Sequence, residues 1–115
     1  MKPEVNFFKE DVQFRLIGKE AVSSWLADCI KKHHKKPGTL NFIFCSDEFL
    51  YSMNIKYLNH KTLTDIITFD YSEKSIISGD IFISIDRVRE NAKLLKNSIK
   101  DELHRVMIHG VLHLC

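Results

Sequence analysis

Apolar residues recur at the spacing of an amphipathic helix in four stretches of the chain. These stretches cover residues 19–32, 49–58, 88–99 and about 100–115. This spacing predicts four helices, each with one buried face. Ser46 is suited to cap the second helix, because Asp47 and Glu48 follow it and give the helix an acidic first turn. Pro37-Gly38 is expected to end the first.

Four shorter runs are rich in β-branched and aromatic residues, which predicts strands. They cover residues 5–8, 40–45, 65–71 and 80–85. The run 40–45 is compact and mostly apolar, as expected of a strand buried on both faces, and residues 72–78 are expected to form a hairpin connection. The order of elements predicts an α+β fold, with a single mixed β-sheet of about four strands and helices packed against it. The first helix is expected to face this sheet through Trp25, Leu26 and Cys29.

Length and composition are those of one globular domain, residues 1–115. The chain is 44% hydrophobic and 28% charged, and its formal net charge is +2. This mild positive charge permits a nucleic-acid partner without arguing for one. Three cysteines without paired spacing indicate reduced thiols, and no segment predicts a signal peptide or a membrane span. We therefore expect a cytoplasmic protein with no membrane partner, whose oligomeric state the sequence does not determine.

Two histidines, His109 and His113, are one turn apart in the last predicted helix. Residues four apart share a helix face, so both imidazoles could bind one metal ion. They fall in the narrow polar sector of this helix, beside Glu102 and Arg105. A catalytic zinc site uses three protein ligands and keeps an open position for water. The pattern indicates two ligands of such a site, although two partly buried, hydrogen-bonded histidines remain an alternative.

Further short segments follow one another in a recognisable order. Residues 54–57 read N-I-K-Y, residues 63–69 read L-T-D-I-I-T-F, residues 79–84 read G-D-I-F-I-S and residues 109–114 read H-G-V-L-H-L. They resemble the L-N-x-x-Y-R…P-T-D-V-L-S-F, G-D-I-x-I-S and H-G-x-L-H-L-x-G-x-D-H motifs of the YbeY-type rRNA maturation factors. The resemblance extends from about residue 54 to the end of the chain.

This resemblance implies a zinc-dependent, single-strand-specific endoribonuclease. It implies a role in maturation of the 3′ end of small-subunit rRNA and in ribosome quality control, with rRNA and the small ribosomal subunit as partners. One Zn²⁺ ion would be held by three histidines. His109 and His113 match the first two, and the third is expected beyond Cys115, so that the tail of the family is missing here.

The same resemblance suggests a cleft around the two histidines. It places Thr64 and Asp65 at the mouth of this cleft, where Asp65 could orient a ligand histidine or act as a base. A turn that satisfies backbone donors is the alternative for both residues. Thr68 and Ser84 alternate with apolar neighbours and could face the cleft or solvent.

The sequence departs from the family pattern at Leu58, which stands where the pattern has arginine. An arginine could hold phosphate through two parallel hydrogen bonds, which leucine cannot form. Phosphate contact would then fall to Lys56, Lys61 or Arg105. The basic residues 31–36 are interpreted as a solvated helix end, with an RNA-backbone contact as the alternative.

Two other classes of function remain open. Two histidines on a helix suit a zinc-dependent hydrolase of peptide or amide bonds equally well, although no glutamate follows His109 to give the H-E-x-x-H motif of zinc peptidases. The other class is a ribosome-associated binding protein without catalytic activity, which would fit Leu58.

Overall fold

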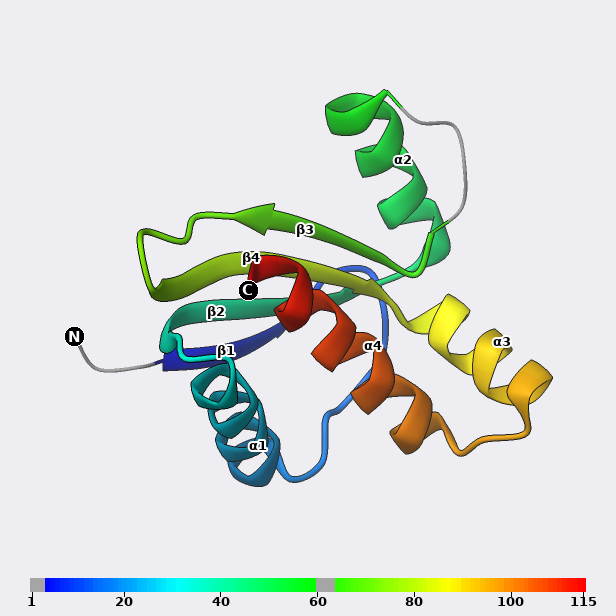
Figure 1. Ribbon diagram of the computed structural model, residues 1–115. Coiled ribbons are helices and arrows are strands. Elements are labelled where there is room, and N and C mark those ends of the chain that lie inside the picture. Colours follow the sequence, from blue (N-terminus) through cyan, green and yellow to red (C-terminus); the bar gives the residue numbers. More distant parts are fainter. Residues whose placement is uncertain (1–3, 60–63) are drawn as a thin grey trace.

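The computed structural model describes residues 4–59 and 64–115, which form four strands and four helices. In chain order these are β1 (Glu4–Lys9), α1 (Lys19–Lys32), β2 (Lys36–Cys45), α2 (Asp47–Leu58), β3 (Ile66–Asp70), β4 (Ile76–Ser84), α3 (Ile85–Leu95) and α4 (Ile99–Leu114). One mixed sheet has the strand order β1-β2-β4-β3, with only the β3–β4 pair antiparallel (Figure 1). The predicted α+β fold with a single mixed sheet is confirmed.

The sheet carries a hydrophobic core on each face. In β4, Ile81 and Ile83 belong to the larger core and Phe82 to the smaller one. Successive strand residues point to opposite faces, so the two cores lie on opposite sides of the sheet. Helices α1, α3 and α4 contribute to the larger core, and α2 covers the smaller one through Leu50. The larger core therefore fixes the position of α4, the helix with the two histidines.

Two glycines let α4 approach the sheet closely. A Cβ atom at Gly110 would lie 2.6 Å from Ile66 and 2.9 Å from Ile81, closer than side chains pack. On β4, a Cβ atom at Gly79 would lie 2.5 Å from the Phe69 carbonyl oxygen and 3.0 Å from Leu114. Hydrogen at both positions therefore sets the height of α4 above β3 and β4.

Several predicted boundaries were wrong. Strand β2 begins at Lys36, so Pro37-Gly38 lies inside the strand, next to an irregularity in its pairing with β4. Ile99 begins α4 instead of ending α3, because Ser98 caps α4 by accepting a hydrogen bond from the Asp101 backbone N–H. The β3–β4 connection is shorter than predicted, since β4 already starts at Ile76.

Helix α1 has the predicted bounds and faces the sheet through Leu26, which is fully buried. Trp25 departs from the prediction: it is 37% exposed and lies against His104 of α4, with ring centroids 5.4 Å apart. The three cysteines are free, as predicted. None of the helices in the described ranges is long and apolar enough to cross a membrane.

Candidate metal centre

The two histidines lie together on the exposed side of α4. Residues such as Val106, Met107 and Val111 bury the other side of the helix in the larger core. The Nε2 atoms of His109 and His113 are 2.9 Å apart, and the rings are nearly perpendicular, at 79°. At this distance one nitrogen can donate a hydrogen bond to the other. The pair therefore presents two imidazole nitrogens to a common point.

The donor set fits zinc in part. Neutral imidazole is a preferred zinc ligand, and two nitrogens on one tetrahedral zinc lie about 3.4 Å apart. A small movement of the rings from 2.9 Å would give that separation. No further His, Cys, Asp or Glu among residues 4–59 and 64–115 joins the pair in a group of three. The described chain therefore offers two of the ligands that a catalytic zinc needs.

Arg105 lies one turn before His109 on the same helix. Its Nε donates a hydrogen bond of 3.0 Å to Glu102, which is fully buried. The hydrogen bond to Glu102 raises the pKa of Arg105. The Arg105 side chain is nevertheless 52% exposed, and guanidinium carries five N–H donors. Glu102 thus holds this cation in place while leaving part of it accessible.

Asp65 is linked to this helix through Arg105. Its carboxylate lies 4.0 Å from the Arg105 guanidinium, and its backbone carbonyl accepts a hydrogen bond from the Ser84 N–H. The neighbouring Thr64 hydroxyl donates to the Ile66 carbonyl oxygen. Asp65 and Arg105 are therefore brought together at the start of β3. A cleft formed by the histidines with Thr64, Asp65 and Thr68 stays a prediction.

The two remaining predicted residues lie on different faces of the sheet. Thr68 shares a face of β3 with Ile66, which packs against α4. Ser84 shares the opposite face of β4 with Phe82 and is fully buried. Its hydroxyl donates to Asp47 at 2.7 Å and accepts from the Arg87 N–H. The expectation that Ser84 lines the histidine cleft was therefore wrong, because the hydroxyl caps α3 instead.

Ser84 belongs to a polar cluster that sequence reasoning missed. We call Asp47, Ser84 and Arg87 the cap cluster. Arg87 Nε donates to both carboxylate oxygens of Asp47, at 3.0 and 3.1 Å. The Asp47 backbone N–H donates to Asp86 at 2.9 Å. Ser84 followed by an acidic first turn is an N-cap signal that could have revealed part of the cluster.

Leu58, at the position of the motif arginine, and the two candidate phosphate-binding lysines belong to α2 and the segment that follows it. Leu58 is 43% exposed at the end of α2. Lys56 lies over the Tyr57 ring, 5.3 Å from its centroid. Lys61 lies outside the described residues. The structure thus places an apolar side chain on the surface at the position where the motif has arginine.

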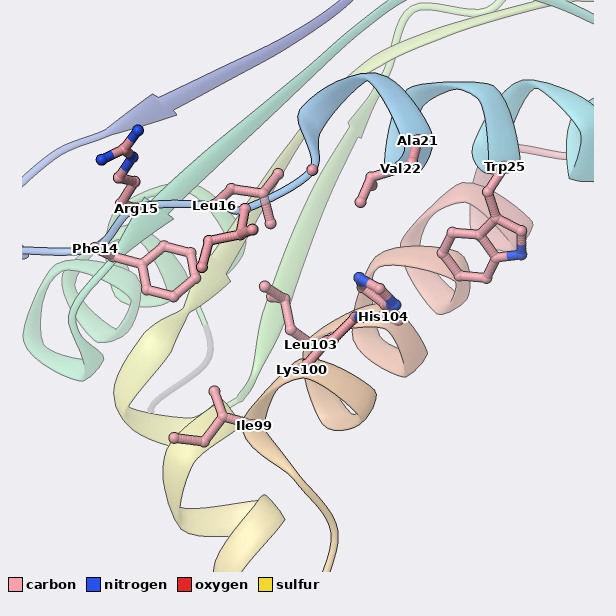
Figure 2. A pocket seen from close by; sticks show the side chains of 12 residues that line it. Phe14, Arg15, Leu16, Ala21, Val22, Trp25, Ile99, Lys100, Leu103 and His104 are labelled. Carbon is pink, nitrogen blue, oxygen red and sulfur yellow. The ribbon is translucent and has the colours of Figure 1, made fainter.

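A cavity of about 510 Å³ lies between α1, the segment before it and the start of α4. Figure 2 shows Leu16, Val22 and Leu103 around it, with Trp25 beside His104 at one side. Burial lowers the pKa of His104, which favours its neutral form. The two candidate ligands, His109 and His113, are not among the residues that line this cavity.

Comparisons with known proteins identify one family. The family model described as "Endoribonuclease YbeY" matches residues 6–115. A protein of that name from Cytophaga hutchinsonii is 54% identical over 116 residues, covering 99% of this chain and 81% of the relative. Another from Parabacteroides distasonis is 49% identical over 111 residues, covering 96% and 78%.

A solved structure has a similar fold. The solution structure of TM1509 from Thermotoga maritima superposes with a TM-score of 0.66 at 27% identity, covering 96% of this chain and 71% of that one. Similarity therefore extends over almost all of the chain in both sequence and fold. The chain belongs to the YbeY endoribonuclease family.

Proposed function

We propose that the chain is a metal-dependent endoribonuclease that cuts single-stranded ribosomal RNA. Its role would be maturation of the 3′ end of small-subunit rRNA and ribosome quality control, in the cytoplasm and on the small ribosomal subunit. Family membership supports the endoribonuclease activity. The observation that carries metal dependence is the pair of imidazole nitrogens 2.9 Å apart on the exposed side of α4.

The proposed cofactor is one zinc ion. His109 and His113 would hold it, with a further ligand from outside the described residues. When bound, zinc lowers the pKa of a water molecule toward 7 and stabilises negative charge on phosphoryl oxygens. The chain's own residues would bind and orient the RNA at this point.

Arg105 is the residue best placed to bind a phosphate next to the histidines. It lies one turn from His109, and its guanidinium is only partly engaged by Glu102. A guanidinium forms strong, directional hydrogen bonds to phosphate oxygens. Asp65 would act as a positioning residue, because its carboxylate faces Arg105 at 4.0 Å and limits the directions the guanidinium can take.

The test is cleavage of an RNA oligonucleotide with the sequence of the 3′ end of small-subunit rRNA. Wild-type protein with zinc is expected to cut the single-stranded form and to leave the same RNA intact when it is paired to its complement. His109→Ala and His113→Ala should abolish cutting, and Lys96→Ala should cut like wild type. Cleavage that persists in both histidine variants, or in wild type after chelation of the metal, would overturn the proposal.

The same preparations separate this function from the other two classes. Exposed Leu58, at the position of the motif arginine, favours a ribosome-binding protein without catalysis as the second candidate. Co-sedimentation with small ribosomal subunits, unchanged in His109→Ala and without RNA cutting by either form, would support that candidate. Digestion of casein that depends on zinc and on both histidines would indicate a peptide hydrolase instead.

A further inference from the structure

The cavity between α1, the segment before it and the start of α4 is a groove with an apolar floor and an apolar rim. Leu16, Val22 and Leu103 form the floor and are buried, and Figure 2 shows them around one space although they come from three different parts of the chain. Trp25 and Ile99 lie at the rim and are exposed. Exposed apolar side chains that gather around a hollow are typical of surfaces that bind a ligand or a partner. The groove is therefore a candidate binding site.

The size and the lining of the groove indicate a small ligand with an alkyl chain. The groove has a volume of about 510 Å³, and small-molecule sites commonly measure about 300–1,000 Å³ and are lined mainly by apolar side chains. The apolar part of this lining consists of six aliphatic side chains and two aromatic ones. Aliphatic side chains and an alkyl chain attract one another through many weak dispersion contacts. A hydrocarbon chain therefore suits this lining better than a flat, polar ring system.

The ionisable side chains that line the groove are all basic. They are Arg15, Lys100 and His104, and no Asp or Glu among residues 4–59 and 64–115 joins them. Lys100 and His104 are four residues apart in α4, so they share one face of the helix, and both lie on the α4 side of the groove (Figure 2). None of the ion pairs within the described ranges includes Arg15 or Lys100. A negatively charged head group therefore complements the charge of this groove.

His104 connects the basic side of the groove to Trp25. The two ring centroids are 5.4 Å apart. Burial, and after it the positive charge of Lys100, lower the pKa of His104, whereas Asp101 opposes that shift without lining the groove. Trp25 is the only tryptophan of the sequence. The fluorescence of one indole ring therefore reports on a ligand that binds beside Lys100 and His104.

We infer that the groove binds an amphiphilic carboxylate, with the alkyl chain of the ligand over the buried floor and its carboxylate paired with Lys100. Burial of apolar surface would supply most of the affinity, and the charge pair would fix the orientation of the ligand. This inference goes beyond the proposed RNA cleavage and does not depend on it, because neither His109 nor His113 lines the groove.

The experiment compares three ligands that share one alkyl chain: decanoate, decanol and decyltrimethylammonium, each below the concentration at which it aggregates. Calorimetry and the fluorescence of Trp25 measure binding. Ala21→Phe places a large side chain in the lining, and Ser24→Phe, at an exposed position of α1 outside the lining, is its control. Lys100→Gln removes the positive charge, and Lys93→Gln, at an exposed position of α3, is its control. Thermal unfolding checks that all four variants are folded.

Decanoate is expected to bind more tightly than the neutral and the cationic ligand. Ala21→Phe should weaken decanoate binding at least about tenfold, because its ring occupies the space of the alkyl chain. Lys100→Gln should weaken decanoate binding about threefold and leave decanol binding unchanged, as expected for an exposed ion pair. Both control variants should bind decanoate like the wild type.

The inference would be overturned by the absence of saturable decanoate binding, by equal affinities for decanoate and decanol, or by variants that lose no more affinity than their controls. Two further results would assign the groove to another occupant and overturn it as well. One is self-association of the wild type that Ala21→Phe abolishes, without decanoate binding. The other is a change in Trp25 fluorescence on addition of oligouridylate that decanoate does not produce.

Discussion

The cap cluster and the histidine pair are two polar groups with opposite relations to the rest of the molecule. In the cap cluster, Asp47 accepts hydrogen bonds from Ser84 and Arg87, and the side chains are largely shielded. In the histidine pair, the exposed rings contact each other through Nε2. Hydrogen-bonding capacity used up inside the protein stabilises the fold, whereas capacity left at the surface remains available for a ligand.

Arg105 combines both properties. The buried Glu102 carboxylate fixes one edge of its guanidinium, and the side chain is 52% exposed. The buried part of this contact explains how a flexible cation is held one turn from His109. The exposed part provides the donors that a phosphate would use.

The strongest test of this comparison is removal of one imidazole. His109→Ala or His113→Ala should lower RNA cleavage by more than about 100-fold, beyond the effect of changing a residue that only orients a metal ligand. The free energy of unfolding should change by no more than about 0.5 kcal/mol, because both side chains are exposed. Single-turnover cleavage and urea unfolding of the same preparations measure the two effects. A drop in stability large enough to account for the drop in cleavage would show that the pair is structural.

Adding a third metal ligand to the histidine pair should increase its affinity for zinc. The described residues offer two imidazoles to a metal, so the 115-residue chain should bind zinc weakly. A chain extended beyond Cys115 with the remaining residues of the family motif, including its third histidine, should bind zinc at least about 100-fold more tightly. Affinity should fall in mildly acidic buffer, because protonated imidazole cannot coordinate. Calorimetric titration of both chains is the measurement, and equal affinities would exclude a ligand in the extension.

Disrupting the cap cluster should have the opposite effect to removing an imidazole: the free energy of unfolding should fall and RNA cleavage should not. Asp47→Ala leaves Arg87 and the Ser84 hydroxyl without their carboxylate partner, which should cost about 1–3 kcal/mol of unfolding free energy. Cleavage per folded molecule should stay at the wild-type level. Glu48→Ala, in the same helical turn, serves as the control in chemical denaturation. A change in cleavage without a change in stability would assign the cluster to the active site.

The smallest expected effect concerns His104. Burial lowers its pKa below the unfolded value of 6.5, so the unfolded chain takes up a proton first as pH falls. The stabilising contribution of neutral His104 is therefore complete above pH 6.5 and decreases as pH falls toward the folded pKa. His104→Gln should reduce the decline in stability between pH 7.5 and pH 5.5. Urea unfolding followed by the fluorescence of Trp25 reports on this region, and identical pH dependence in the wild type and His104→Gln would contradict it.

Local patterns predicted much of this structure. Helical spacing identified α1 with its observed bounds and placed His109 and His113 on one face of α4. Alternation along β4 separates Ser84 from Ile83, but it does not say which face α4 will cover. The cap cluster joins residues 37 and 40 positions apart, and only the pairing of β2 with β4 brings them together. Pro37 was predicted to end a helix because the local sequence does not show that residues around it pair with β4. That pairing places Pro37 inside β2.

The close approach at Gly110 would also affect the entropy of the proposed metal binding. Position 110 lies between the two histidines, where any larger side chain would collide with Ile66 and Ile81. The helix backbone under both imidazoles is therefore held against the sheet before a ligand arrives. When a metal binds, only the side-chain torsions of His109 and His113 would still have to be fixed. Fixing one such side chain costs about 0.5–1.5 kcal/mol. Most of the conformational restriction that the proposed metal site needs in the two histidines has already been imposed by folding.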